Sequence, residues 1–214
     1  MLKTKCFCFN AFGENTYVVY DETGECAVVD PGNSNAYEAQ QLYDFFDENK
    51  LTLKTIFVTH GHIDHVAGMA VLKEKYGAEI IAHRDARGYI QTADHQAAMF
   101  GFGGVAKLPM PDREIEEHEA VAVGRGFLEA IATPGHAEGS FSYYAEAEGV
   151  VFTGDALFCR SIGRTDFLGG DFDTLRDSIR RKLFTLPADT VVLSGHGEPT
   201  TIGEEKDFNP FVAV

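Results

Sequence analysis

Short apolar runs separated by turn residues dominate the start of the chain. Residues 6–10 and 16–20 are strand-like in composition, and the turn-rich segment 12–15 separates them. A third apolar run, 27–29, ends at Asp30-Pro31-Gly32-Asn33, a sequence that stops a strand. The pattern therefore predicts three short strands before the first helix.

Helices and strands then alternate along the chain. Ser34 is the expected N-cap of a helix that runs to about Asn49, with Leu42, Phe45 and Phe46 in its apolar stripe. The elements predicted after it are a strand at 54–58, a helix at 66–76 stopped by Gly77, a strand at 79–82 and a short helix at 85–92.

The segment 94–111 differs in texture from its surroundings. Glycines and prolines interrupt aromatic and apolar residues there, among them Met99, Phe100 and Phe102. Long loops within a compact domain are commonly functional or mobile. We therefore predict a lid or a substrate wall, with a cover for the hydrophobic core as the alternative.

A second strand-rich block runs from about residue 120 to residue 154. A helix from a cap at Asp173 to about Leu183 follows it, and a final strand is expected at 190–193. Two strand-rich blocks, each with helices, favour two sheets packed face to face with helices outside. No linker or charge run marks a domain boundary, so residues 1–214 are expected to form a single domain.

Composition and charge narrow the functional classes. The 18 basic and 33 acidic residues give a net charge of −15, which argues against nucleic-acid and anionic-membrane partners. No apolar stretch approaches the roughly 20 residues that span a bilayer, and the N-terminus lacks the apolar core of a secretory signal. The four cysteines do not make a disulfide framework, and Cys6 and Cys8 are expected to pack rather than to form a bridge. A cytoplasmic protein is the expectation.

The strongest chemical signal lies directly after the apolar run 56–58. Three imidazoles and one carboxylate, from His60, His62, Asp64 and His65, fall within six positions. Imidazole nitrogen and carboxylate oxygen are ligands that zinc, iron and manganese accept in proteins. The glycine between the first two histidines allows the tight bend that lets neighbouring side chains converge. The stretch therefore predicts a metal site.

Three further polar groups stand where apolar strands end. His136, Asp155 and His196 each follow a predicted strand, with glycine beside them, so all three are expected at the same edge of the sheets as the histidine-rich loop. Seven ligands are too many for one tetrahedral zinc and suit two ions. A carboxylate can bridge two ions, so Asp155 is the natural bridge. Three other histidines lack this setting and are expected on the surface or in loops: His83, His95 and His118.

These motifs resemble those of the metallo-β-lactamase superfamily. The resemblance rests on the H-x-H-x-D-H loop, the histidine in T-P-G-H, the aspartate in T-G-D and the histidine in S-G-H-G, and it spans residues 30–196. It implies an α+β protein with a four-layer αββα sandwich and a metal centre at one edge. The implied ligands are His60, His62 and His136 for the first ion, Asp64, His65 and His196 for the second, and Asp155 joining them. Asp30 would match a buried family aspartate that orients a histidine, with turn capping alone as the alternative.

Within the superfamily the chain is most similar to the compact glyoxalase II-like hydrolases. The similarity lies in segments 161–167, 169–171, 200–205 and 209–211. Full-length hydroxyacylglutathione hydrolases carry a further helical region after the last ligand that helps to bind glutathione. Only 18 residues follow His196. We therefore expect no C-terminal helical glutathione-binding domain here.

The resemblance implies a binuclear metal-dependent hydrolase. Two divalent ions, zinc with iron or manganese as alternatives, would hold a bridging hydroxide that attacks the carbonyl of a thioester such as S-lactoylglutathione. Asp64 would orient this nucleophile as well as bind metal. Arg164 either grips a substrate carboxylate or forms an ion pair with Asp166, and the nearby Cys159 is expected to be a buried thiol.

Other functions of the same fold remain as alternatives. A persulfide dioxygenase would share a G-R-T-D-F segment but use one iron, and a lactonase or β-lactamase would use similar hydrolytic chemistry. The full ligand set argues against a non-catalytic metal-binding protein, and the acidity argues against a nuclease. The expected partner is a small molecule, with neither nucleic acid nor membrane.

Overall fold

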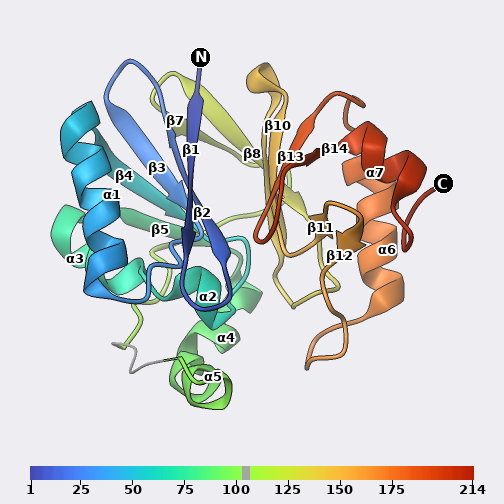
Figure 1. Cartoon of the computed structure of the whole chain (residues 1–214), viewed down its shortest axis with the longest axis horizontal. Coiled ribbons are helices and arrows are strands. Elements are labelled where there is room, and N and C mark those ends of the chain that lie inside the picture. The colour runs from blue at the N-terminus through green and yellow to red at the C-terminus, as the bar shows by residue number, and fades with distance from the viewer. Residues whose placement is uncertain (103–106) are drawn as a thin grey trace.

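The chain forms two sheets that pack face to face between two layers of helices (Figure 1). The structure is a computed structural model that describes residues 1–102 and 107–214. Helices α1 (Ala36–Asn49) and α3 (Met69–Tyr76) cover the outer face of one sheet. Helices α6 (Phe172–Arg181) and α7 (Ile202–Phe208) cover the outer face of the other. The predicted α+β class and four-layer αββα sandwich are confirmed.

Each sheet has six strands. The first runs in the order β1 (Lys3–Phe9), β2 (Glu14–Tyr20), β3 (Glu25–Val29), β4 (Thr52–Phe57), β5 (Glu79–Ala82) and β6 (Arg113–Glu114). The second runs in the order β14 (Thr200–Thr201), β13 (Val191–Ser194), β10 (Val150–Gly154), β9 (Phe141–Ala145), β8 (Gly126–Ala132) and β7 (Ala120–Val123). A small hairpin of β11 (Leu157–Phe158) and β12 (Ser161–Ile162) lies outside both. Since β3 to β6 are parallel, and β10 and β13 are parallel, several strands end at the same edge.

The helices connect these strands. Their bounds are α1 (Ala36–Asn49), α2 (Ile63–Val66), α3 (Met69–Tyr76), α4 (Arg87–Gln91), α5 (Ala93–Phe100), α6 (Phe172–Arg181) and α7 (Ile202–Phe208). Short 3₁₀ turns lie at η1 (Arg84–Ala86), η2 (Glu146–Glu148) and η3 (Leu183–Thr185). None of the helices among the described residues is both long and apolar enough to cross a membrane. The cytoplasmic location stays a prediction.

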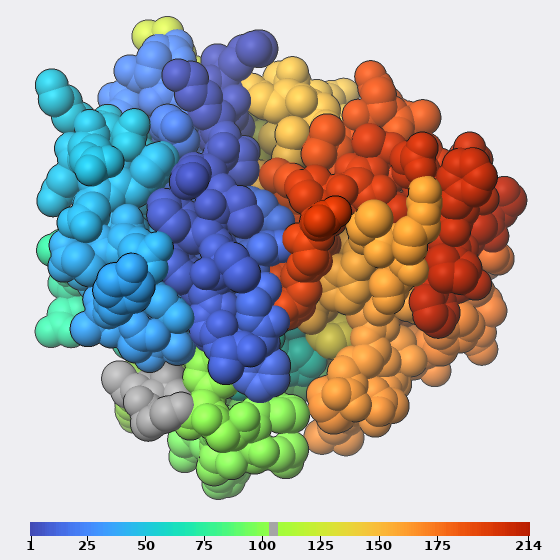
Figure 2. Space-filling model, viewed as in Figure 1, coloured from blue at the N-terminus to red at the C-terminus, as the bar shows by residue number. Residues whose placement is uncertain are grey.

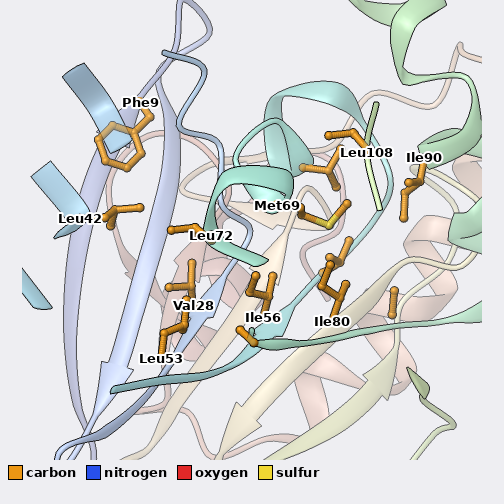
Figure 3. Packing of buried hydrophobic residues seen from close by; sticks show 14 of the residues in the cluster. Phe9, Val28, Leu42, Leu53, Ile56, Met69, Leu72, Ile80, Ile90 and Leu108 are labelled. Carbon is orange, nitrogen blue, oxygen red and sulfur yellow. The ribbon is translucent and has the colours of Figure 1, made fainter. Parts of the chain in front are cut away.

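Three apolar clusters hold the layers together. One lies between the sheets, and one lies under the helices on each outer face. Figure 3 shows the first outer cluster, in which Leu42 of α1 and Leu72 of α3 meet Val28 and Ile56 of the strands. Each fully buried side chain of this kind contributes about 1.5–3 kcal/mol relative to its exposed state. The sheet that carries β4 is therefore packed on both faces, and this packing holds the histidine-rich loop that follows β4 in place.

Two predicted helix caps are wrong by one or two residues. Asn35, not Ser34, caps α1, because its backbone is extended (φ −148°, ψ 169°) and its side chain accepts from the Glu38 N–H. Asp171, not Asp173, caps α6 for the same reason, with φ −152° and a bond from the Thr174 N–H. An N-cap needs a non-helical backbone as well as a side-chain acceptor, and composition alone does not reveal that backbone.

The segment 94–111 is not a loop throughout, which corrects the prediction. Helix α5 extends to Phe100 and ends at Gly101, whose φ is 68°. Ala93 and Ala97 are buried in the outer cluster together with Leu108, whereas Met99 is largely exposed. The segment therefore covers the core with one face and is free to line a site with the other. Two of the glycines that suggested a loop, Gly103 and Gly104, lie outside the described residues, which resume at residue 107.

Two smaller expectations are also wrong. The strand at 191–194 is not the last, because β14 pairs with it antiparallel before α7 begins. Cys6, Cys8 and Cys159 are exposed free thiols rather than packed or buried ones. Alternation places Cys6 and Cys8 on one face of β1 as expected, but β1 is an edge strand and little covers that face.

Candidate metal centre

The seven predicted ligands meet at one edge of the sandwich. The loop after β4 and the short helix α2 carry four of them, and the ends of β8, β10 and β13 precede the other three. The seven residues are His60, His62, Asp64, His65, His136, Asp155 and His196. The sheet order explains the meeting, because β4 of one sheet and β10 and β13 of the other end on the same side.

Three imidazoles form one group. The His62 Nδ1 lies 3.0 Å from the His60 Nε2 and 2.9 Å from the His136 Nε2. All three nitrogens fall within 4.8 Å of one another, and His60 and His136 are buried. Three imidazole nitrogens directed at one point are a common protein ligand set for a catalytic divalent ion.

A carboxylate and two imidazoles form a second group beside it. The Asp64 Oδ2 lies 3.7 Å from the His65 Nε2 and 3.3 Å from the His196 Nε2. Asp155 lies between the groups, with its Oδ1 3.3 Å from the His65 Nε2 and its Oδ2 3.6 Å from the His136 Nε2. Asp155 therefore faces both groups, as a bridging carboxylate must.

Unpaired atoms test whether these residues fit a metal. The His65 Nε2 and the Asp155 Oδ1 are buried and have no hydrogen-bond partner among the described residues. Buried polar atoms in folded proteins almost always have a partner. Because both atoms point into a set made only of nitrogen and oxygen donors, a divalent cation such as zinc, iron or manganese satisfies them. The site fits the metal that its residues suggest.

The ring nitrogen that does not face the centre is fixed in four of the histidines. The Thr59 hydroxyl lies 3.0 Å from the His60 Nδ1 and donates to the Asp30 Oδ2 at 2.6 Å. The same Asp30 oxygen lies 3.0 Å from the His65 Nδ1. An acceptor at Nδ1 holds the proton there and leaves the Nε2 lone pair free for a metal. Asp30 thus contacts one histidine directly and a second through Thr59.

Backbone carbonyls accept from the Nδ1 of the other two histidines. The His136 Nδ1 lies 2.8 Å from the Arg164 carbonyl oxygen, and the His196 Nδ1 lies 3.2 Å from the Phe12 carbonyl oxygen. Sequence reasoning missed both contacts, since every residue carries a carbonyl and nothing marks these two. Thr59 could have been found, because its hydroxyl directly precedes the first ligand.

Asp30 is itself held in an unusual conformation. Its φ is 50°, in the left-handed region that non-glycine residues rarely occupy. Its carboxylate also accepts from the Thr59 N–H at 2.7 Å, so its oxygens serve Thr59 and His65. Asp30 lies close enough to His60 and His65 to form a third possible ligand group. These hydrogen bonds are the ones that an orienting residue makes, and the orienting role of Asp30 stays a prediction.

Burial and charge set the protonation of the ligands. Burial, together with the neighbouring imidazoles, lowers the pKa of His60 well below its ordinary value, and burial lowers the pKa of His62 to about 4. Burial alone would raise the pKa of Asp155, but His65 outweighs it and holds that pKa far below its usual range. Neutral imidazoles and an ionised carboxylate are the forms that bind metal.

A glycine allows the last ligand to approach. A Cβ on Gly195 would lie 2.3 Å from the Asp155 Oδ1 and 2.5 Å from the His65 Cε1, distances that no side chain tolerates. Two side chains of β2 hold this loop in place: the Asn15 amide donates to the Ser194 and Gly197 carbonyls, and the Tyr17 hydroxyl donates to the Ser194 carbonyl. Asn15 and Tyr17 are positioning residues that sequence reasoning missed.

Glu14 is a further residue that the sequence did not single out. It is fully buried beside the second group, its Oε1 has no hydrogen-bond partner among the described residues, and its Oε2 accepts from the Thr16 hydroxyl at 2.8 Å. Burial raises its pKa well above the ordinary value. Burial thus favours the neutral form of the Glu14 carboxyl.

Arg164 lies at the mouth of the site in an ion pair. Its guanidinium donates to both carboxylate oxygens of Asp166, at 2.7 and 2.8 Å, and stacks 3.6 Å from the ring centroid of Phe167. The ion pair with Asp166, one of the two roles predicted for Arg164, is therefore present. Its contact with a substrate stays a prediction.

The remaining histidines lie outside the ligand set. His83 stacks on Phe141, His118 pairs with Glu129 on the surface, and His95 lines a neighbouring pocket.

A cavity of about 300 Å³ lies over the ligands, walled by Phe12, Phe100 and Phe167. In Figure 2 this region is the hollow where the N-terminal hairpin, α5 and the 160–170 segment meet.

Replacing Thr59 by valine is expected to weaken metal binding by about tenfold, the lower end of what outer partners of metal ligands contribute. The valine keeps the shape but removes the hydroxyl that joins Asp30 to His60. Competition with a chromophoric chelator measures the affinity. Thr185→Val, which removes an exposed hydroxyl bonded to the Lys182 carbonyl, is the matched control. Equal affinities for both variants would contradict the role of Thr59.

Comparisons with known proteins agree with this geometry. The family model for the metallo-beta-lactamase superfamily matches residues 10–196, which include all seven predicted ligands. The hydroxyacylglutathione hydrolase GloC of Haemophilus influenzae is 38% identical over 204 residues, covering 94% of each protein. The crystal structure of BLEG-1 B3 metallo-beta-lactamase has a TM-score of 0.90 at 33% identity and covers 100% of both chains. The crystal structure of TTHA1623 in a di-iron-bound form has a TM-score of 0.87 at 33% identity and covers 97% of this chain and 99% of the other.

Proposed function

Because the chain belongs to the metallo-β-lactamase superfamily, we propose that it is a binuclear metal-dependent hydrolase that cleaves thioesters in the manner of a hydroxyacylglutathione hydrolase. We propose His60, His62 and His136 as ligands of one ion, Asp64, His65 and His196 as ligands of the other, and Asp155 as the bridge. We further propose that residues 1–214 act as one catalytic domain, since these ligands come from both sheets.

One observation carries the proposal. Asp155 faces both ligand groups, and the buried Asp155 Oδ1 and His65 Nε2 have no partner among the described residues. The overlap with GloC over 94% of each protein supports the thioester, and the di-iron form of TTHA1623 supports two ions. Zinc is our first choice of metal, with iron or manganese acceptable to the same donors.

The chemistry is divided between the ions and the chain. Divalent ions bound here supply an activated water and Lewis-acid stabilisation of the charge that develops on the carbonyl oxygen and on the departing sulfur. The Asp64 carboxylate faces the cavity over the ligands; although burial opposes it, His65 and His196 lower its pKa, so it stays ionised. The Asp64 carboxylate is therefore able to orient the attacking water by accepting a hydrogen bond from it. A thiolate leaves without a proton donor, so this reaction needs no general acid.

The walls of the cavity position the substrate. Phe12, Phe100 and Phe167 come from three separate segments and restrict water above the ligands. Among the described residues that line this cavity, Arg164 is the one arginine or lysine, and its pair with Asp166 is exposed. We propose that Arg164 turns from Asp166 to a substrate carboxylate where the substrate carries one.

The test is hydrolysis of S-lactoylglutathione by purified protein loaded with zinc, iron or manganese. Hydrolysis is expected for the wild-type protein and for His118→Ala, an exposed histidine outside the ligand set, but not for His60→Ala. If neither S-lactoylglutathione nor a neutral thioester is cleaved above the His60→Ala rate, the proposed thioesterase activity is wrong.

Metal analysis and further substrates, tested on the same protein, distinguish the two alternative functions. One iron per chain with oxygen uptake on glutathione persulfide would replace the proposal with a persulfide dioxygenase. Cleavage of a lactone alone would make the protein a lactonase of the same fold. The second ligand group, Asp64, His65 and His196, is the feature that favours a hydrolase with two ions.

A further inference from the structure

An apolar pocket of about 510 Å³ adjoins the cavity over the metal ligands. The two spaces share four lining residues, His62, Gln96, Phe100 and Phe167, so they lie side by side. The pocket is formed by α4, α5, the turn that carries Glu138 and the segment at 167–168. A molecule whose reacting carbonyl lies over the ligands therefore has a place for one of its arms between α4, α5 and residue 168.

Aromatic contacts hold the walls of this pocket in place. Phe100 packs on Phe167 at 5.8 Å between ring centroids, and Tyr89 packs edge-on against His62 at 5.3 Å. The Tyr89 hydroxyl donates to the Leu168 carbonyl at 2.8 Å, which joins α4 to the opposite wall. The pocket is thus formed before any ligand arrives.

Helix α5 is also tied to the metal loop. The Gln96 side-chain oxygen accepts from the Ile63 N–H at 3.0 Å, and its amide donates to the Tyr89 carbonyl at 2.8 Å. The position of the pocket relative to the ligands is therefore fixed by hydrogen bonds as well as by packing.

Exposed apolar side chains gather at the rim. Met99 is 76% exposed and Leu168 is 92% exposed. Large apolar side chains in water cost free energy, and their concentration around a concave site marks a surface that contacts a ligand. Here both residues line the pocket beside the metal ligands.

Charge excludes an acidic occupant. Asp85 and Glu138 line the pocket, and the described residues that line it include no lysine or arginine. At the opening of the adjoining cavity, the Arg164 guanidinium is already paired with Asp166. Glutathione has two carboxylates and one ammonium, so a carrier of this net negative charge would meet two acidic groups in this pocket and no lysine or arginine among its described lining residues.

We infer that the pocket selects thioesters with an uncharged, apolar arm, an alkyl or aryl chain, over thioesters in which this arm is polar or acidic. The inference rests on the proposed thioester hydrolysis and narrows its substrate class. S-Lactoylglutathione, which has a small polar acyl group and an acidic carrier, is then a slow substrate rather than the preferred one.

A series of thioesters tests this directly. The acyl groups acetyl, butanoyl, hexanoyl and phenylacetyl are compared on one neutral thiol, N-acetylcysteamine, and on glutathione, with metal-loaded protein. We expect kcat/KM to rise with chain length by up to about fourfold for each methylene that is buried. We also expect the neutral thioester to exceed the glutathione thioester of the same acyl group. A flat response to chain length, or faster cleavage of the glutathione series, overturns the inference.

Two pocket variants and one control locate the effect. Met99→Asp places a carboxylate at the rim and is expected to lower the hexanoyl-to-acetyl ratio of kcat/KM by about fifteenfold, the effect of leaving two methylenes unburied. Glu138→Lys is expected to raise kcat/KM for the glutathione thioesters by roughly two- to fivefold, the scale of one exposed charge pair. Phe127→Ala removes an exposed aromatic side chain from β8, outside the pocket, and should change neither ratio.

Binding separates this inference from the proposed reaction. Calorimetric titration of the metal-loaded protein compares the hexyl thioether of N-acetylcysteamine with S-hexylglutathione, neither of which can be hydrolysed. If no thioester is cleaved but the neutral thioether binds more tightly, and Met99→Asp weakens it, the pocket is assigned correctly and only the reaction is wrong. Equal or tighter binding of S-hexylglutathione overturns the pocket assignment whatever the activity.

Discussion

Replacing Asp155 by asparagine is expected to lower thioester hydrolysis by roughly 10²- to 10³-fold, the range for loss of one electrostatic group at a reacting centre. The asparagine keeps the size of the side chain but removes the charge that faces both ligand groups. A neutral amide is a weaker ligand for divalent ions than an ionised carboxylate, so the loss of this charge acts against holding two ions.

Two measurements are needed for this variant. Metal analysis after loading and dialysis is expected to fall from two ions per chain to one or none, and kcat/KM is measured in the same samples. Circular dichroism establishes that the variant is folded. Asp173→Asn on α6, where an exposed carboxylate pairs with Arg176, is the matched control and should behave as wild type. Two bound ions and kcat/KM within tenfold of wild type in Asp155→Asn would contradict the bridging role.

The free energy of unfolding of the metal-free protein is expected to fall by about 2 kcal/mol between pH 7 and pH 5 through His62 alone. Burial lowers the pKa of His62 to about 4 in the folded chain, from the ordinary value of 6.5. The unfolded chain therefore binds a proton at His62 below about pH 6.5, whereas the folded chain does not until about pH 4. Stability from this group is complete above pH 6.5 and is lost as the pH falls toward 4.

The other ligands act in both directions within this window. The pKa of His60 is also lowered by burial, so His60 adds to the loss. Although burial opposes it, the neighbouring carboxylates raise the pKa of His65 and of His196, so these two groups stabilise the folded chain more as the pH falls through about 6.5 and offset part of the loss. Asp64 and Asp155 lose their stabilising effect only below about pH 3.8, since their pKa values are lowered.

Urea unfolding of the metal-free protein at the two pH values measures this difference. His62→Gln is expected to flatten the pH dependence by about 2 kcal/mol, because glutamine does not titrate. His118→Gln, which removes an exposed histidine, should leave the dependence as in wild type. Equal pH dependence of His62→Gln and wild type would show that His62 is not buried as a neutral imidazole.

The fold, and the seven side chains that meet at one edge of it, were largely readable from the chain. The H-x-H-x-D-H loop needs only local spacing, and His136, Asp155 and His196 each follow an apolar strand with glycine beside them. Apolar runs of four or five residues bounded by turn residues place strands well, because burial of such runs is the main driving force. The resemblance of these motifs to one superfamily then supplied the order of the layers.

The predictions that were wrong concern segments whose local sequence is compatible with two structures. Ser34 and Asn35 are both good caps, and only the path of the chain into α1 selects the second. Segment 94–111 contains glycine and proline, yet the alanines at 93 and 97 pack on the outer cluster and carry α5 to Phe100. Packing against a distant surface overrode the local signal in that segment.

The identity of the metal-competent residues and their grouping at strand ends were determined by the sequence itself, because ligand chemistry and hydrophobic periodicity are local properties. The tertiary structure alone decided how those residues are oriented and what adjoins them. Thr59, the carbonyls of Phe12 and Arg164, and the apolar pocket under Met99 and Tyr89 become visible only when segments far apart in the chain meet. Contacts through backbone atoms and the shape of a cavity depend on that meeting, which no single stretch of sequence encodes.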